Sequence, residues 1–138
     1  MLEKDVVLSK IAIIQRCLKR IDDIVAGDAS KVDQLDVQEI ASLNLQRAIQ
    51  ASIDMANVVI SLKSLGLPAS YKQSFWLLEQ ENIISSDLSN RMKGMVGFRN
   101  IAVHDYSELD MNILKSILKD HLGDFEKFYE IVYKLFLD

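Results

Sequence analysis

Residues 36–65 read DVQEIASLNLQRAIQASIDMANVVISLKSL and contain neither glycine nor proline. Apolar side chains recur in this run at intervals of three and four residues, as in Ile49, Ile53, Ala56 and Ile60. Because each residue of an α-helix turns by about 100°, that spacing gathers the apolar side chains on one face. The run therefore predicts a long helix that buries this face against other helices.

Both ends of this helix carry sequence signals. Asp36 is expected to be the N-cap, with Glu39 at the capping-box position. At the other end, Gly66 is expected to supply the left-handed residue that helix ends favour, and Pro68 cannot continue a helix. The helix is thus expected to run from about Asp36 to Leu65.

The same periodicity predicts further helices before and after this one. They are expected over about residues 5–26, 71–80, 86–104 and 111–136. Ser70, with Gln73, is expected to cap the short helix and Asp110 the last, which contains Gly123 in its interior. Four main helices and one short helix predict an all-α protein, an antiparallel four-helix bundle that forms one domain over residues 1–138.

Composition limits the class of protein. The chain has 138 residues, of which 49% are hydrophobic and 26% charged, and no apolar run approaches the roughly 18 residues that cross a bilayer. The first residues lack the pattern of a secretory signal, and the lone Cys17 has no partner for an internal disulfide. These features predict a cytoplasmic protein with no membrane contact.

The net charge of −4 argues against a protein that coats nucleic acid non-specifically, because such binding depends on lysines and arginines. It is compatible with a local site. A few arginines that meet across a dimer axis can form a positive cleft on an otherwise acidic molecule.

Residues 99–106 read RNIAVHDY and carry Arg99, His104 and Tyr106 in the pattern R-x4-H-x-Y. Five helical steps separate Arg99 from His104 by about 140°, so they cannot share one face of a continuous helix. Either the helix ends between them, or the two residues work together with their copies from a second chain. The polar run that begins at His104 predicts a helix end close to that residue.

This constellation fits metal-free cleavage of RNA. An imidazole such as that of His104 can take a proton from a ribose 2′-hydroxyl or give one to a leaving oxygen, while the guanidinium of Arg99 binds the phosphate. DNA lacks the 2′-hydroxyl and would not react. The structural alternative is that His104 caps the carbonyls of a helix end.

Two further patterns allow alternative interpretations. The polar residues Arg47, Gln50, Asp54, Asn57 and Ser61 follow one stripe of the second long helix, either as a solvated face or as a cleft wall on which Asp54 orients an arginine or histidine of the motif. Gly94 and Gly97 share a helical face and predict close approach of another backbone, inside the bundle or across a dimer interface.

Other chemistries lack their sequence patterns. The two histidines, His104 and His121, have no nearby cysteine and do not form a zinc site. No strand precedes a glycine-rich loop, and no nucleophile elbow is present. We therefore expect no metal and no cofactor.

The segment GFRNIAVHDY at residues 97–106 resembles the signature of HepT-like proteins, formerly the DUF86 family, within the HEPN superfamily. A second segment, LQRAIQASIDMA at residues 45–56, resembles the second helix of that family. The length and the order of the predicted helices are similar too, so the resemblance spans nearly the whole chain.

The resemblance implies a toxin ribonuclease that forms homodimers in which the motifs of both subunits face one cleft. Arg99 is then the phosphate-binding residue, His104 the general acid or base, and Asn100 a secondary candidate. The implied partner is a minimal nucleotidyltransferase antitoxin of the MntA type, which inactivates such a toxin by transferring AMP to the motif tyrosine, here Tyr106.

Two other functions compete with the ribonuclease. One is a non-catalytic helical module that partners a minimal nucleotidyltransferase, and the other is a nucleotide-binding protein without turnover. A packing role for Tyr106 against the start of the last helix is the alternative to its modification.

Overall fold

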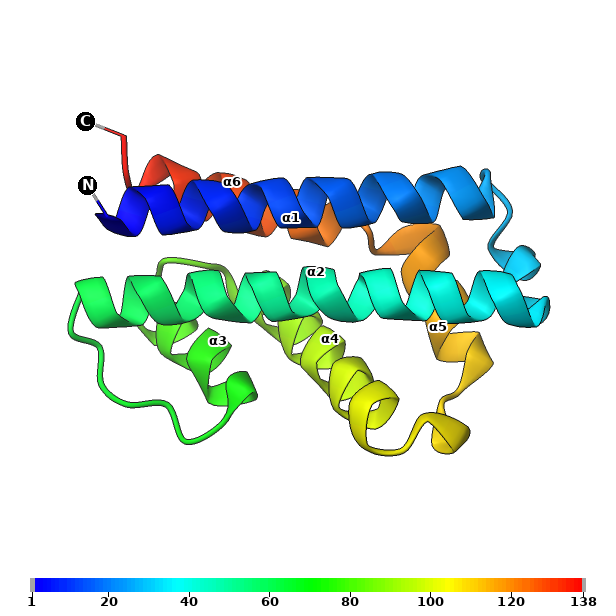
Figure 1. The fold of residues 1–138 in the computed structure, drawn as a ribbon. Coiled ribbons are helices and arrows are strands. Elements are labelled where there is room, and N and C mark those ends of the chain that lie inside the picture. Colours follow the sequence, from blue (N-terminus) through cyan, green and yellow to red (C-terminus); the bar gives the residue numbers. More distant parts are fainter. Residues whose placement is uncertain (1, 138) are drawn as a thin grey trace.

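The computed structural model describes residues 2–137, and these form six α-helices, two short 3-10 helices and no strand (Figure 1). In chain order the elements are α1 (Leu2–Val25), η1 (Ala29–Asp33), α2 (Leu35–Leu62), α3 (Tyr71–Gln80), α4 (Ser86–His104), η2 (Tyr106–Glu108), α5 (Met111–Asp120) and α6 (Gly123–Lys134). The prediction of an all-α bundle is confirmed. No helix in the described range is both long and apolar enough to cross a membrane.

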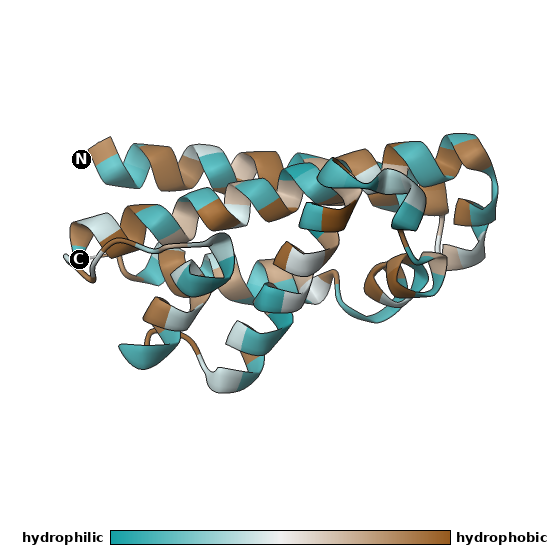
Figure 2. Cartoon of the chain, turned by 90° about the horizontal axis from the view of Figure 1, so that it is seen from below, coloured by the Kyte–Doolittle hydropathy of each residue, from teal (hydrophilic) through white to brown (hydrophobic). Residues whose placement is uncertain are grey.

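Helices α1 and α2 form a long antiparallel pair, α6 packs beside α1, and α3 and α4 lie on the other side of α2 (Figure 1). Each helix alternates hydrophilic and hydrophobic bands, as expected of amphipathic helices (Figure 2). The rings of Phe75 in α3 and Phe128 in α6 meet edge to face, with centroids 5.4 Å apart. Both are fully buried, so this contact joins the short helix to the last one across the core.

Helix α2 begins at Leu35, and its N-cap is Gln34, whose side chain makes no capping bond. The prediction that Asp36 caps this helix is wrong. The reason lies in η1, which the sequence did not predict and which leads into α2 without a loop, since the Gln34 N–H donates to the Lys31 carbonyl. Asp36 lies instead in the first turn, where a carboxylate is favoured by the helix dipole.

The carboxyl end of α2 also differs from its prediction. The helix ends at Leu62, and Ser64 adopts the left-handed conformation at φ 54°, while the Leu65 N–H donates to the Ile60 carbonyl at 3.0 Å. That hydrogen bond is typical of a Schellman ending. The left-handed position therefore falls on Ser64 and not on Gly66, which has φ 118° further along the loop.

The predicted last helix is divided into α5 and α6 at His121 and Leu122, so Gly123 begins a helix instead of lying inside one. The two parts pack on different elements: α5 covers η1, whereas α6 lies against α1 and α2. One straight helix could not pack against η1 and against α1 and α2 at the same time. The low helix propensity of Gly123 makes the helix least costly to break at this position. The N-caps predicted at Ser70 and Asp110 are confirmed, because their side chains accept hydrogen bonds from the N–H groups of Gln73 and Asn112.

We predict that Ser64→Gly stabilises the protein by about 0.5–1 kcal/mol, because a left-handed backbone strains any residue with a Cβ. The exposed Ser61, inside α2, provides the matched control. Ser61→Gly is expected to lower the free energy of unfolding by about 0.5 kcal/mol. Urea denaturation of both variants measures the difference, and destabilisation by Ser64→Gly would contradict the assignment of this helix end.

Candidate active site

Helix α4 runs without interruption through Arg99 to His104, and the Asp105 N–H donates to the Ile101 carbonyl at 2.8 Å. The predicted helix end near His104 is confirmed, and the alternative in which the helix ends between Arg99 and His104 is wrong. On this continuous helix the two side chains leave the axis about 140° apart. They therefore point to different sides of the carboxyl end of α4.

Arg99 is half-buried and held from two sides. Its guanidinium carbon lies 5.1 Å from the centre of the Tyr71 ring, the first residue of α3, and its Nη1 donates to Asn100 Oδ1 at 3.2 Å. A guanidinium over an aromatic face is a favourable cation–π arrangement, worth about 0.5–1 kcal/mol at an exposed site. No sequence spacing pointed to Tyr71 as the partner of Arg99, because Tyr71 lies on another helix.

His104 is the last residue of α4 and is exposed. Within residues 2–137 its imidazole makes no hydrogen bond, and the carbonyl of Ile101 is satisfied by the backbone N–H of Asp105. The carbonyl-capping alternative for His104 is thus not what the structure shows. Both ring nitrogens are open to a proton donor or acceptor from solvent or substrate.

Tyr106 begins η2, immediately beyond α4, and 37% of its surface is exposed. Its hydroxyl donates to Gln38 Oε1 on α2 at 3.2 Å, which anchors the ring to α2. The alternative of packing against the start of the last helix stays a prediction. Burial raises the pKa of the phenol, a hydrogen bond with Ser42 opposes this, and the Glu39 carboxylate adds to the increase. At neutral pH the phenol therefore keeps its proton.

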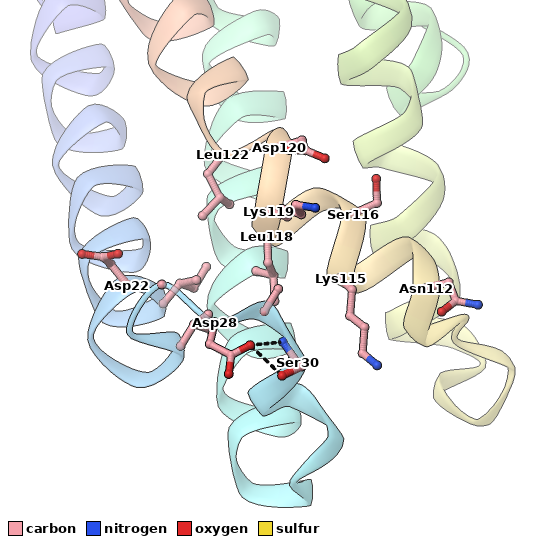
Figure 3. A pocket seen from close by; sticks show the side chains of 14 residues that line it. Asp22, Asp28, Ser30, Asn112, Lys115, Ser116, Leu118, Lys119, Asp120 and Leu122 are labelled. Carbon is pink, nitrogen blue, oxygen red and sulfur yellow. Dashed lines mark hydrogen bonds between the residues drawn. The ribbon is translucent and has the colours of Figure 1, made fainter.

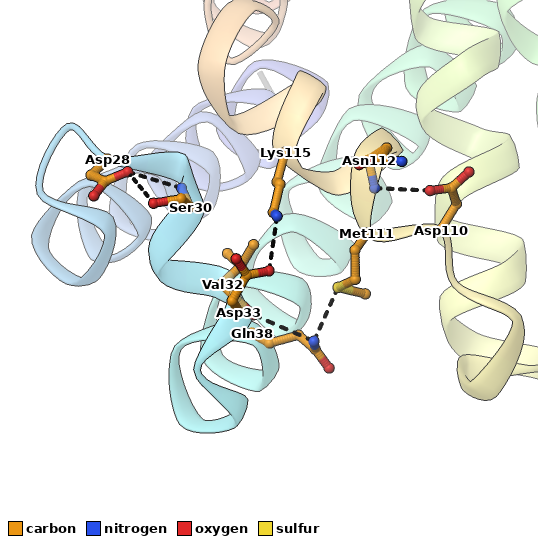
Figure 4. A network of polar contacts seen from close by, with 9 residues as sticks. All are labelled: Asp28, Ser30, Val32, Asp33, Gln38, Asp110, Met111, Asn112 and Lys115. Carbon is orange, nitrogen blue, oxygen red and sulfur yellow. Dashed lines mark hydrogen bonds and ion pairs between the residues drawn. The ribbon is translucent and has the colours of Figure 1, made fainter.

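Gln38 connects Tyr106 to the rest of this end of the bundle. Its Nε2 donates to the carbonyl of Val32 at 3.4 Å and to Met111 Sδ at 3.0 Å, which joins α2 to η1 and α5 (Figure 4). A second link between the same elements is the ion pair of Lys115 with Asp33 at 2.8 Å (Figure 4). These contacts hold α2, η1 and α5 together next to Tyr106.

Asp54 takes no part in the motif region. Its carboxylate pairs with Lys10 Nζ at 3.0 Å and accepts a hydrogen bond from Gln50 at 2.9 Å, so it joins α2 to α1. The prediction that Asp54 orients an arginine or histidine of the motif is wrong, because it lies on the side of α2 that faces α1. Asn57, from the same polar stripe, accepts a hydrogen bond from Ser74 of α3 at 2.7 Å.

The two glycines of α4 are open to the outside. A Cβ added to Gly94 would have nothing within 4 Å, and one added to Gly97 would meet only the side chain of Lys72. The alternative in which another backbone of the bundle approaches these glycines is therefore wrong. Their approach to a second chain stays a prediction.

A buried carboxylate that the sequence did not reveal lies where α5 meets α6. Asp124 is 2% exposed, and its Oδ1 accepts a hydrogen bond from Arg91 of α4 at 3.1 Å, while Oδ2 is 3.4 Å from His121 Nδ1. The Asp124 carboxylate raises the pKa of Arg91. His121 and Asp124 are three residues apart, but no sequence spacing links them to Arg91. The cluster attaches the break in the last helix to α4.

A cavity of about 640 Å³ lies between the end of α1, η1 and α5, away from the motif (Figure 3). Two of its charged side chains are already paired: Asp28 accepts hydrogen bonds from the N–H and the hydroxyl of Ser30, and Lys115 binds Asp33. Within the described residues no group of three or more histidine, cysteine or acidic side chains is arranged to hold a metal ion. The motif at the end of α4 remains the best candidate for chemistry.

The fold and this motif together define a helical bundle of the HEPN type. A family model described as "Ribonuclease HepT-like" matches residues 14–132. The chain therefore belongs to the ribonuclease HepT-like family.

Characterised relatives agree with this assignment. The chain is 46% identical over 129 residues to the mRNA nuclease HepT of Shewanella oneidensis, an alignment that covers 93% of this chain and 96% of the relative. A tri-AMPylated HEPN toxin of Shewanella oneidensis, solved in complex with its MNT antitoxin, is 46% identical with a TM-score of 0.87 and covers 93% and 96% of the two chains. A toxin–antitoxin structure with AMP-PNP is 45% identical with a TM-score of 0.88, covering 93% and 97%.

Proposed function

We propose that this protein is the toxin of a toxin–antitoxin pair and a metal-independent endoribonuclease whose reaction is carried out by Arg99 and His104. The observation that carries the proposal is the placement of both side chains at the accessible carboxyl end of one continuous helix, in a family of ribonucleases. The mRNA nuclease that shares 46% of its residues supports RNA as the substrate.

The chemistry needs only these groups. His104, as a base, takes the proton of the ribose 2′-hydroxyl, and the oxygen then attacks the neighbouring phosphorus. The bond from phosphorus to the 5′-oxygen breaks, that oxygen receives a proton from an imidazolium, and a 2′,3′-cyclic phosphate remains. Arg99 pairs with the non-bridging oxygens as negative charge develops on them.

The divergence of Arg99 and His104 supports a dimer with a composite site. The outward face of α4 carries five residues that lie within about 80° of one another: Asn90, Gly94, Gly97, Ile101 and His104. Ile101 is 42% exposed, and Gly94, where an added Cβ would have nothing within 4 Å, leaves room beside it for a second helix. His104 lies on this face, whereas Arg99 leaves α4 about 140° from it. In the composite site that we propose, His104 of one chain works with Arg99 of the other.

The partner we propose is a minimal nucleotidyltransferase antitoxin of the MntA type. In the transfer, the Tyr106 oxygen would attack the α-phosphorus of ATP, pyrophosphate would leave and the phenol would lose its proton. The AMP-modified relative in complex with its antitoxin supports this proposal. Each AMP adds a negative charge and a base beside His104, which repels and obstructs the RNA.

The ribonuclease is tested by cleavage of total cellular RNA in EDTA by the unmodified protein. Arg99→Ala and His104→Ala are each expected to lower the rate by about 100-fold or more, since each removes a group that acts in the transition state. His121→Ala, which changes the other histidine, is the matched control and is expected to retain cleavage. A folded wild-type dimer without activity would contradict the proposal.

A mixture of variants tests the composite site. Arg99→Ala and His104→Ala proteins, each inactive alone, are unfolded and refolded together so that mixed dimers form. If Arg99 of one chain works with His104 of the other, the mixed dimers contain one complete pair and cleavage partly returns. A mixture as inactive as its components, with mixed dimers shown by native mass spectrometry, would place both groups of a site in one chain.

The modification is tested with Tyr106→Phe, which keeps the ring and removes the hydroxyl. Incubation with the nucleotidyltransferase encoded beside the chain and ATP is expected to add AMP to the wild type and abolish its cleavage. Tyr106→Phe is expected to gain no AMP and to stay active, whereas Tyr133→Phe, at a comparably exposed tyrosine, behaves as the wild type. Mass spectrometry measures the added AMP, and the cleavage assay measures the loss of activity. AMP found on the Tyr106→Phe protein would contradict the assignment of Tyr106 as the modified residue.

A further inference from the structure

Lys72, in the first turn of α3, lies across Gly97 of α4. A Cβ added to Gly97 would be 3.7 Å from Lys72 Nζ and 3.9 Å from its Cε, and it would meet no other neighbouring side chain or helix within 4 Å. The ammonium group of Lys72 thus rests over the backbone of α4 in space that a longer side chain at position 97 would fill.

Lys72 lies close to the proposed catalytic residues Arg99 and His104. Gly97 and His104 are seven residues apart, so they lie about 20° apart on α4 and about 10 Å apart along its axis. Tyr71, the residue before Lys72, holds the guanidinium of Arg99 at 5.1 Å. The first turn of α3 therefore contacts α4 at two places: Tyr71 contacts Arg99, and Lys72 lies beside Gly97.

The charge of Lys72 is not used within the fold. Other lysines of the bundle pair with carboxylates, as Lys93 does with Glu79 at 3.5 Å and Lys10 with Asp54 at 3.0 Å. Within residues 2–137 Lys72 forms no ion pair, and its side chain is exposed. A cation in the first turn of a helix is also disfavoured by the helix dipole, so Lys72 does not serve the stability of α3.

We propose that Lys72 binds a phosphate of the RNA strand next to the one that is cleaved, and so forms a second phosphodiester subsite. This inference rests on the proposed ribonuclease function. RNA whose scissile phosphate lies at the composite site, between His104 of one chain and Arg99 of the other, would extend past the exposed Lys72, which lies beside Gly97 on the α3 side of the face that the second copy of α4 covers. The chain has a net charge of −4, so most of its surface does not attract RNA. Arg99 and Lys72 would attract neighbouring phosphates and so favour one path for the strand.

The subsite predicts an effect on binding and on its salt dependence. Lys72→Ala is expected to raise KM about three- to tenfold with a much smaller change in kcat, because the lost contact lies away from the reacting atoms. The slope of log(kcat/KM) against log salt is expected to become shallower by about 0.7, as for the loss of one contact to single-stranded nucleic acid. Lys72→Arg is expected to retain both values.

Lys63→Ala is the matched control, because Lys63 is an exposed lysine at the end of α2 without an ion pair in the described residues. It is expected to leave KM and the salt slope unchanged. An unchanged KM and slope in Lys72→Ala would overturn the subsite. A loss of kcat that Lys72→Arg does not restore would also overturn it, since that pattern indicates a structural role.

A binding measurement separates failure of this inference from failure of the ribonuclease proposal. Fluorescence anisotropy with a labelled single-stranded RNA is run over a salt series on the His104→Ala protein, with and without Lys72→Ala. Weaker binding and a shallower slope in the double variant support the subsite even if no cleavage is found. Equal binding by both proteins overturns it even if the wild type cleaves RNA.

Discussion

The structure depends on the burial of α2 on several sides at once. This helix packs against α1, η1, α3, α4 and α6, and most residues of its middle section from Ala48 to Ile60 are buried. Small residues such as Ala48 and Ala56 alternate with Ile49 and Ile53, which lets neighbouring helices approach from different directions. The one buried hydroxyl in this section, on Ser52, donates to the Ala48 carbonyl at 2.9 Å and is thereby satisfied within the helix.

The position of the candidate site follows from that arrangement. Helices α3 and α4 lie side by side on α2, with Phe75 of α3 packed against Phe128 of α6. This packing brings the first turn of α3 next to the last turns of α4, where Tyr71 meets Arg99. Because α4 does not bend before His104, the chain by itself separates the two motif residues, which is the physical basis of the composite site proposed for the dimer.

Tyr106 combines accessibility with a fixed position. A tyrosine in a free loop would have to be ordered before it could react, with a cost in conformational entropy. Here the short η2 helix and the hydrogen bond to Gln38 hold the ring at the carboxyl end of α4, while more than a third of its surface stays exposed. The link from Gln38 to Met111 and Val32 ties that position to α5 and η1.

The sequence by itself determined the all-helical fold, the helices as far as the end of α4 at His104 and the motif residues, because helical periodicity is a local property of the chain. Only the tertiary structure decided that the last helix divides at His121 and Leu122, since α5 and α6 cover different elements. It also decided the partners of polar residues: Asp54 binds Lys10, Asp124 binds Arg91, and Arg99 lies on Tyr71. Such pairs join separate helices. Which helix faces meet depends on how the helices pack, and the spacing of residues within one helix does not predict it.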